Sequence, residues 1–215
     1  MAETTHPSMQ TDRMKALADG VFAIVLTILV LGFEVPEHDF GSVGLLPFLL
    51  RLTEPFIAYF VTFGIVSTYW IQHASIFHYV RTGDRGFFWI NLLFLLPVTM
   101  LPFLTNLRAT YHDEYLMTVL YAAANVLCGL LLLAVWRHGS RRQLTRRVAP
   151  EVDRSMRRRI LLGVALNVLG AAVARIDTHL SSVAFISLPL LYISHRVVDS
   201  HWSDAGADAN GGSSR

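Results

Sequence analysis

Six apolar segments, separated by short polar breaks, form the main pattern along the chain. They cover residues 16–33, 54–74, 87–107, 115–136, 158–176 and 181–198. Each approaches the roughly 20 residues that a helix needs to cross a bilayer. None alternates apolar and polar residues with a period of two, as the strands of a membrane β-barrel do. The pattern therefore predicts an all-α membrane protein with six transmembrane helices.

Composition supports this prediction. Of the 215 residues 53% are hydrophobic and 16% are charged, and the mean hydropathy is +0.45. This is too apolar for a disordered chain and too poor in charge for a typical soluble domain. We expect residues 1–200 to form a single transmembrane domain and the small, polar residues 201–215 to be a disordered tail. The polar first 15 residues and the long apolar run after them argue against a cleaved signal peptide.

The basic residues predict the orientation of the six spans. When the ends and loops are assigned alternately to the two sides, 15 of the 18 basic residues fall on one side. Because positively charged loops stay in the cytoplasm, both termini are predicted to be cytoplasmic. Nine arginines lie between residues 137 and 159. We interpret this segment as a cytoplasmic loop with one helical stretch, residues 152–160, that orients the protein and contacts lipid headgroups. A nucleic-acid partner would need a longer basic stretch.

An ionisable side chain inside a span is a functional candidate by default, and Asp19 is the clearest one. Arg13 precedes it by six residues, about 9 Å along a helix axis, so the two are not expected to pair within one helix. We expect each to bond to a neighbouring helix. A carboxylate in the first turn of a helix is also favoured by the helix dipole alone. Residue type therefore leaves both a structural and a functional role of Asp19 open.

The rest of the first span is apolar. Ile24, Ile28 and Leu31 share one helical face, with Thr27 as the sole polar side chain there. Spacing alone is typical of aliphatic residues that face lipid or pack on another helix, and does not predict a pore.

Further polar candidates lie in the second and third spans. Trp70 and His73 are near the end of the second, and Asn91 is near the start of the third, where its amide needs a partner. His73 and His78 are five residues apart, so they do not share a helical face and a two-histidine metal site is disfavoured. We expect His73 to belong to a polar cluster near the cytoplasmic side.

Catalytic signatures are missing from the sequence. It has no Gly-x-Ser-x-Gly, no phosphate-binding glycine loop and no His-Glu-x-x-His. The single cysteine, Cys128, excludes an internal disulfide and a multi-cysteine metal site. We predict that the protein is not an enzyme and has no cofactor or metal. One alternative from the polar residues is a small secondary transporter or proton-coupled carrier, with Asp19 and His73 as a relay.

Several ordered motifs run through the first half of the chain. The first span has Arg13, three residues, Leu17-Ala18-Asp19 and then Gly20-Val-Phe-Ala-Ile24. The later motifs are Tyr69-Trp70-x-x-His73, Trp89-x-Asn91-Leu-Leu-Phe-Leu and Leu101-Pro102-Phe103-x-Thr105. Together they resemble the transmembrane protein 175 family, the lysosomal potassium channels and their bacterial relatives. The resemblance covers residues 13–107, and the first motif departs from the family's Phe-Ser-Asp at Leu17 and Ala18.

The resemblance implies a homotetramer that conducts potassium through a central pore lined by the first helix. On that basis Ile24 would form the tightest ring, a hydrophobic constriction, with Ile28 and Leu31 in wider rings toward the outside. Thr27 could offer its hydroxyl to ions. Selectivity for potassium over sodium would be weak to moderate, since aliphatic rings cannot replace a hydration shell.

The same resemblance assigns a structural role to five polar residues that would hold the first helix to its neighbours: Arg13, Asp19, Trp70, His73 and Asn91. The expected partners are monovalent cations, membrane lipids and three further copies of the chain, without nucleic acid. Glu34, Glu37 and Asp39 could concentrate cations at the outer mouth. A single six-helix unit favours a bacterial protein of the inner membrane.

Overall fold

The computed structural model describes residues 7–33, 44–111, 113–177, 181, 183–187 and 189. Within these ranges the chain is all-helical apart from turns and one isolated bridge between Val80 and Thr145. The elements are α1 (Pro7–Ile28), the 3-10 helix η1 (Leu29–Gly32), α2 (Leu45–Arg51), α3 (Thr53–Tyr79), α4 (Arg85–Thr110), α5 (Tyr115–Arg141) and α6 (Pro150–Val173).

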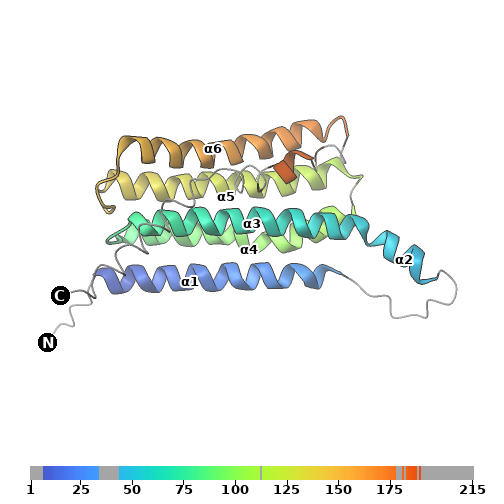
Figure 1. Ribbon diagram of the computed structural model, residues 1–215, viewed down its shortest axis with the longest axis horizontal. Coiled ribbons are helices and arrows are strands. Elements are labelled where there is room, and N and C mark those ends of the chain that lie inside the picture. The colour runs from blue at the N-terminus through green and yellow to red at the C-terminus, as the bar shows by residue number, and fades with distance from the viewer. Residues whose placement is uncertain are drawn as a thin grey trace, which may run out of the picture.

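The long helices lie side by side in an elongated bundle (Figure 1). α1 packs against α3 and α4 on one side of the bundle, α4 packs against α5, and α6 covers α5 on the opposite side. α2 is a short helix that precedes α3 and projects beyond the end of the bundle in this view. α1 is therefore covered by helices on one side, and among the described residues its other side has no helix packed on it.

Among the residues that the structure describes, four helical stretches are long and apolar enough to cross a membrane. They are Gln10–Gly32, Leu46–Tyr79, Arg85–Thr110 and Tyr115–Arg141. They agree with the first four predicted spans. The predicted fifth segment, 158–176, falls in α6, whose first turns are rich in arginine. Most of the predicted sixth segment, 181–198, lies outside the described residues, as do the tail 201–215 and the acidic Glu34, Glu37 and Asp39.

The arginine-rich segment contains the predicted helical stretch, 152–160, but more of it is helical than predicted. α5 continues to Arg141 and α6 already begins at Pro150, so most of residues 137–159 are helical. Proline is suited to a first helical position because its nitrogen needs no hydrogen-bond partner there. An ion pair of 2.7 Å between Arg157 and Asp153, one turn apart, supports the same helix. α4 likewise runs through Pro97 and Pro102 as one helix.

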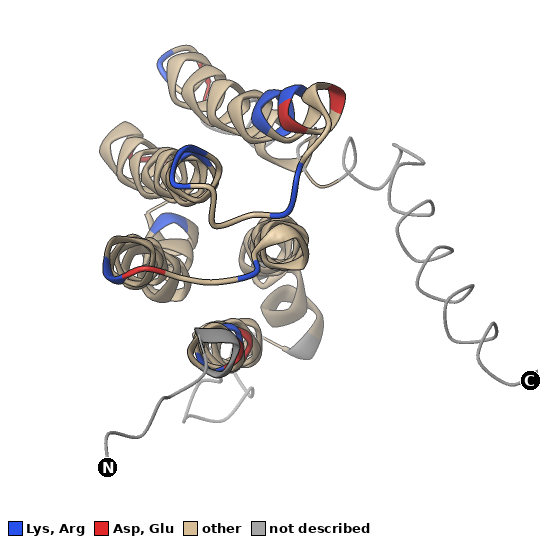
Figure 2. Ribbon diagram, turned by 90° about the vertical axis from the view of Figure 1, so that its left-hand side faces the viewer, with Lys and Arg blue, Asp and Glu red and all other residues tan. Residues whose placement is uncertain are grey.

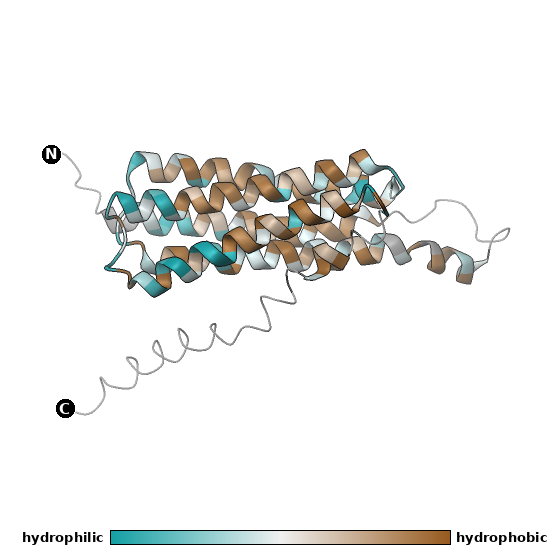
Figure 3. Cartoon of the chain, turned by 90° about the horizontal axis from the view of Figure 1, so that it is seen from above, coloured by the Kyte–Doolittle hydropathy of each residue, from teal (hydrophilic) through white to brown (hydrophobic). Residues whose placement is uncertain are grey.

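The two loops at the charged end of the bundle contact each other. The Arg81 amide donates to the Leu144 carbonyl over 2.9 Å, and the Arg146 amide donates to the Tyr79 carbonyl over 2.8 Å. These contacts join the α3–α4 loop to the α5–α6 loop. Figure 2 shows lysine and arginine gathered at this end, and Figure 3 shows the hydrophilic end next to the apolar middle of the helices. Basic residues from separate loops thus share one end, in line with the predicted common side.

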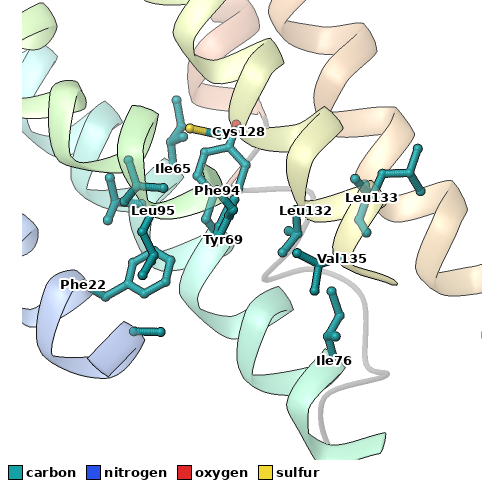
Figure 4. Packing of buried hydrophobic residues seen from close by; sticks show 14 of the residues in the cluster. Phe22, Ile65, Tyr69, Ile76, Phe94, Leu95, Cys128, Leu132, Leu133 and Val135 are labelled. Carbon is teal, nitrogen blue, oxygen red and sulfur yellow. The ribbon is translucent and has the colours of Figure 1, made fainter. Parts of the chain in front are cut away.

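The core lies between α1, α3, α4 and α5. Figure 4 shows Phe22 of α1 near Leu95 and Phe94 of α4, with Tyr69 of α3 and Cys128 of α5 on the same cluster. The rings of Phe22 and Phe94 lie 6.1 Å apart. In lipid, helices associate through such packing and through hydrogen bonds rather than through a hydrophobic force. The core therefore fixes which face of α1 is left outward.

Candidate functional site

The two faces of α1 have very different surroundings. Ala18, Phe22, Val25 and Leu29 are buried against the bundle. On the other face Leu17 is 48%, Ile24 60% and Leu31 76% exposed. Both faces are apolar, so sequence polarity does not separate them.

All four predicted pore residues lie on the less buried part of α1 and η1. Ile28 is 38% exposed, and Thr27 is exposed too. The Thr27 hydroxyl donates to the Ile24 carbonyl over 2.8 Å, which ties it to its own helix. A hydroxyl that donates in this way keeps its oxygen lone pairs as acceptors. The stripe is thus aliphatic with one oxygen acceptor in its middle.

Asp19 and Trp70 meet across α1 and α3. The Trp70 indole Nε1 donates to Asp19 Oδ1 over 2.9 Å. A tryptophan N–H can only donate, so the direction of this bond is fixed. Trp70 is still 41% exposed, which places the bond at the rim of the helix pair. It links α1 to α3.

His73 and Asn91 form a second connection, fully buried between α3 and α4. His73 Nε2 lies 3.1 Å from Asn91 Oδ1, and Asn91 Nδ2 donates to the Phe87 carbonyl over 2.8 Å. Because the amide nitrogen is used at Phe87, its oxygen faces the imidazole, which assigns the proton to Nε2. The ring of Phe22 lies 5.9 Å from that of His73. α1 therefore packs on this pair through an aromatic contact.

The predicted network is brought together in part. Asp19 and Trp70 form one link, and His73 and Asn91 form another. Arg13 is exposed on α1 and takes no part in either link among the described residues. Within the same ranges no hydrogen bond joins Asp19 to His73, so the two groups of the alternative relay are held by different partners.

A hydroxyl cluster further along the bundle was not predicted. Thr62 Oγ1 lies 2.8 Å from the Tyr121 hydroxyl and accepts from Thr105 Oγ1 over 2.9 Å, which links α3, α5 and α4. Tyr69 donates to the Asn125 carbonyl over 2.8 Å. The sequence did contain a signal for this cluster. Single hydroxyl and amide residues lie inside apolar segments, and buried polar groups need hydrogen-bond partners.

Arg108 is a basic residue that lies inside the bundle rather than in a loop. It belongs to α4 and is 8% exposed. Its guanidinium lies 5.6 Å from the ring centre of Tyr121 and 5.2 Å from that of Phe185. Stacking on aromatic faces lets an arginine enter an apolar surrounding.

At the charged end, Asp84 holds the start of α4. Its carboxylate accepts from the Phe87 amide over 2.6 Å and lies 2.8 Å from His138 Nε2 of α5. Burial raises the pKa of the Asp84 carboxyl, but the Phe87 amide and His138 outweigh this and leave the pKa below its ordinary value. Sequence reasoning missed this contact, because 54 residues separate the partners. No group of three or more potential metal ligands occurs in the described ranges.

The chain is similar in sequence and in fold to known potassium channels. Residues 13–102 match the family model described as the endosomal/lysosomal potassium channel TMEM175. A potassium channel of Chamaesiphon minutus is 32% identical over 86% of this chain and 95% of its own length. A potassium channel of Streptomyces collinus is also 32% identical, over 86% and 88%. The crystal structure of a TMEM175 homolog from Chamaesiphon minutus, described as a lysosomal potassium-selective channel homolog, superimposes with a TM-score of 0.75 at 29% identity. It covers 86% of this chain and 96% of that one.

Proposed function

Because the chain belongs to the TMEM175 family, we propose that it is a potassium-permeable cation channel of the bacterial inner membrane. Four copies would surround a central pore lined by α1. Each copy would contribute one domain, residues 1–200, with six membrane helices and both termini in the cytoplasm. The gathering of basic loops at one end of the bundle supports this orientation.

The exposed apolar face of α1 is the observation that carries the proposal. A helix that packs on α3 and α4 through Phe22 and Val25 leaves Ile24 and Leu31 outward. Thr27 adds an oxygen acceptor to this stripe. In a ring of four subunits this is the face available to an axial pathway.

Selectivity would come from dehydration and pore width. Four copies of Ile24 would form the narrowest ring, and Ile28 and Leu31 would form wider rings toward the outside. A hydrophobic constriction gates by excluding water. Since isoleucine has no ligand to replace an ion's hydration shell, discrimination between potassium and sodium would be weak to moderate.

The links between α1 and its neighbouring helices would set the position of this ring. Trp70 holds Asp19 from α3, and the His73–Asn91 pair forms the surface on which Phe22 of α1 packs. We assign these groups a structural role, since each is held by protein partners. Arg13 would act from the exposed side of α1, toward a neighbouring subunit or the headgroups.

A flux assay in liposomes tests the proposal. Purified protein should pass potassium down its gradient, and Ile24→Asn should raise sodium permeability several-fold because a polar ring is wetted more easily. Leu96→Asn is the matched control, since Leu96 of α4 is 63% exposed and receives the same change. No potassium flux from the wild type, or an equal sodium leak in both variants, would contradict the proposal.

A further inference from the structure

We propose that the groove between the start of α1 and the start of α4 binds the headgroup and upper acyl chain of an anionic phospholipid. A cavity of about 300 Å³ lies there, lined by Gln10, Gly83, Arg85, Phe88, Trp89 and Leu92. This volume is at the lower end of the range of about 300–1,000 Å³ for ligand pockets. It suits a headgroup and the first part of a chain rather than a large ligand.

The order of side chains along α4 follows the order of groups in a phospholipid. Arg85, Trp89 and Leu92 occupy positions i, i+4 and i+7, so they lie on one face of the helix. They supply a cation, an interfacial aromatic ring and an aliphatic side chain over roughly 10 Å of helix length. Tryptophan prefers the headgroup boundary of a membrane. A phosphate at Arg85 would therefore place the acyl chain along Trp89 and Leu92.

The charge of the side chains that line the cavity favours an anionic ligand. Arg85 is the one charged side chain among the six lining residues, and it is exposed. Its neighbour Asp84 is engaged by the Phe87 amide and by His138, so that carboxylate is directed to other partners. Arginine matches the geometry of a phosphate, with two N–H groups in a fixed fork. Gln10 adds an amide from the α1 side of the cavity.

The loop over the cavity is close-packed, which limits how the cavity can change. A Cβ at position 83 would come within 2.6 Å of the Phe88 ring, so any larger residue there would have to displace that ring. The ring of Phe88 lies 6.1 Å from the buried Phe87. A lipid in this cavity would touch α1 and α4 together. Any effect on conduction rests on the proposed function, whereas the binding itself does not.

Tryptophan quenching by brominated lipid tests the binding without ion flux. The protein is reconstituted in phosphatidylcholine vesicles, and phosphatidylglycerol brominated near its carbonyl end is titrated in. Brominated phosphatidylcholine serves as the neutral counterpart. Subtracting the signal of Trp89→Phe isolates the contribution of Trp89. We expect phosphatidylglycerol to quench Trp89 at about a tenfold lower mole fraction than phosphatidylcholine, which corresponds to about 1.4 kcal/mol.

Two arginine variants separate the cavity from the general basic surface. Arg85→Gln should remove the preference for phosphatidylglycerol. Arg158→Gln is the matched control, because Arg158 is an exposed arginine of α6 outside the cavity, and it should keep the preference. Inorganic phosphate should leave the quenching unchanged.

The proposal is overturned if both lipids quench Trp89 equally, or if Arg158→Gln loses the preference as fully as Arg85→Gln does. It is also overturned if inorganic phosphate displaces the lipid, which would assign the site to the free anion. No quenching of Trp89 by either lipid would equally overturn it, as when another subunit covers the groove. None of these results depends on whether the protein conducts potassium.

Discussion

The two faces of α1 have nearly the same chemistry and opposite surroundings. Phe22 and Val25 are each 1% exposed, whereas Ile24 and Leu31 are 60% and 76% exposed. The buried face packs on the aromatic surface formed by His73 and Phe94. Between Ile24 and Leu31 the outward face carries one polar side chain, Thr27, whose hydroxyl donates a hydrogen bond to its own helix. The comparison shows that one apolar helix can pack on its own bundle with one face and leave a second apolar face free for another role.

The largest expected effect is on the packed face. Phe22→Ala should lower the free energy of unfolding by about 2–3 kcal/mol, mainly through the cavity it leaves, because lipid is as apolar as the core. Leu31→Ala on the outward face should change it by less than about 0.5 kcal/mol. Titration with sodium dodecyl sulfate in mixed micelles measures both. Equal losses would mean that the two faces are not distinct.

The second-largest effect concerns the buried pair of His73 and Asn91, on which the packed face of α1 lies. Asn91→Leu should cost about 1–2 kcal/mol, because it leaves the His73 N–H buried without its acceptor. The double variant His73→Phe, Asn91→Leu removes both polar groups and should recover most of that loss. The same unfolding assay compares the variants. A double variant that is as unstable as the sum of two single variants would argue against a direct pair.

The hydrogen bond between Trp70 and Asp19 should contribute less to the free energy of unfolding. Trp70→Phe keeps an aromatic ring but removes the donor to Asp19, and should cost about 0.6 kcal/mol, a typical value for a hydrogen bond between membrane helices. Trp89→Phe is the matched control, since Trp89 is 57% exposed on α4. If the control loses as much stability as Trp70→Phe, the Asp19 bond contributes nothing measurable.

The smallest effect lies at the charged end, away from both faces of α1. Asp84→Asn keeps a capping side chain but removes its charge, and should cost about 0.5 kcal/mol near pH 7 because the group is partly exposed. The Asp84 pKa lies below its ordinary value of 3.8. Its contribution is therefore fully present well above that ordinary value and is lost as the pH falls through the lowered pKa.

Thermal unfolding of wild type and Asp84→Asn at a series of pH values measures this difference. The two melting temperatures should converge as the pH is lowered below 3.8. A gap that stays constant through that range would show that the charge of Asp84 does not contribute.

Much of the helical arrangement could be predicted from the sequence. The first four apolar segments correspond to α1, α3, α4 and α5, because uninterrupted runs of apolar residues determine membrane helices directly. The helical stretch predicted at 152–160 lies within α6, but its continuation into the fifth apolar segment as one helix from Pro150 was not predicted. α2, with seven residues, is too short to produce a periodic signal.

The candidate site was predictable only as a set of residues. Family motifs pointed to Ile24, Thr27, Ile28 and Leu31, but spacing alone did not tell their face from a lipid-facing one. The partners of Asp19 and His73 depend on which helices pack together. The contacts of Asp84 with His138 and of Trp136 with Asp153 join loops and helix ends that no local pattern connects.

Thiol accessibility tests most directly whether the outward face of α1 lines an ion pathway. The native chain offers a clean background, because its single cysteine, Cys128, is fully buried. A charged methanethiosulfonate reagent should leave potassium flux of the wild type and of Phe22→Cys unchanged, and should block that of Leu31→Cys. Full flux through Leu31→Cys after complete labelling would contradict a pore lined by this face.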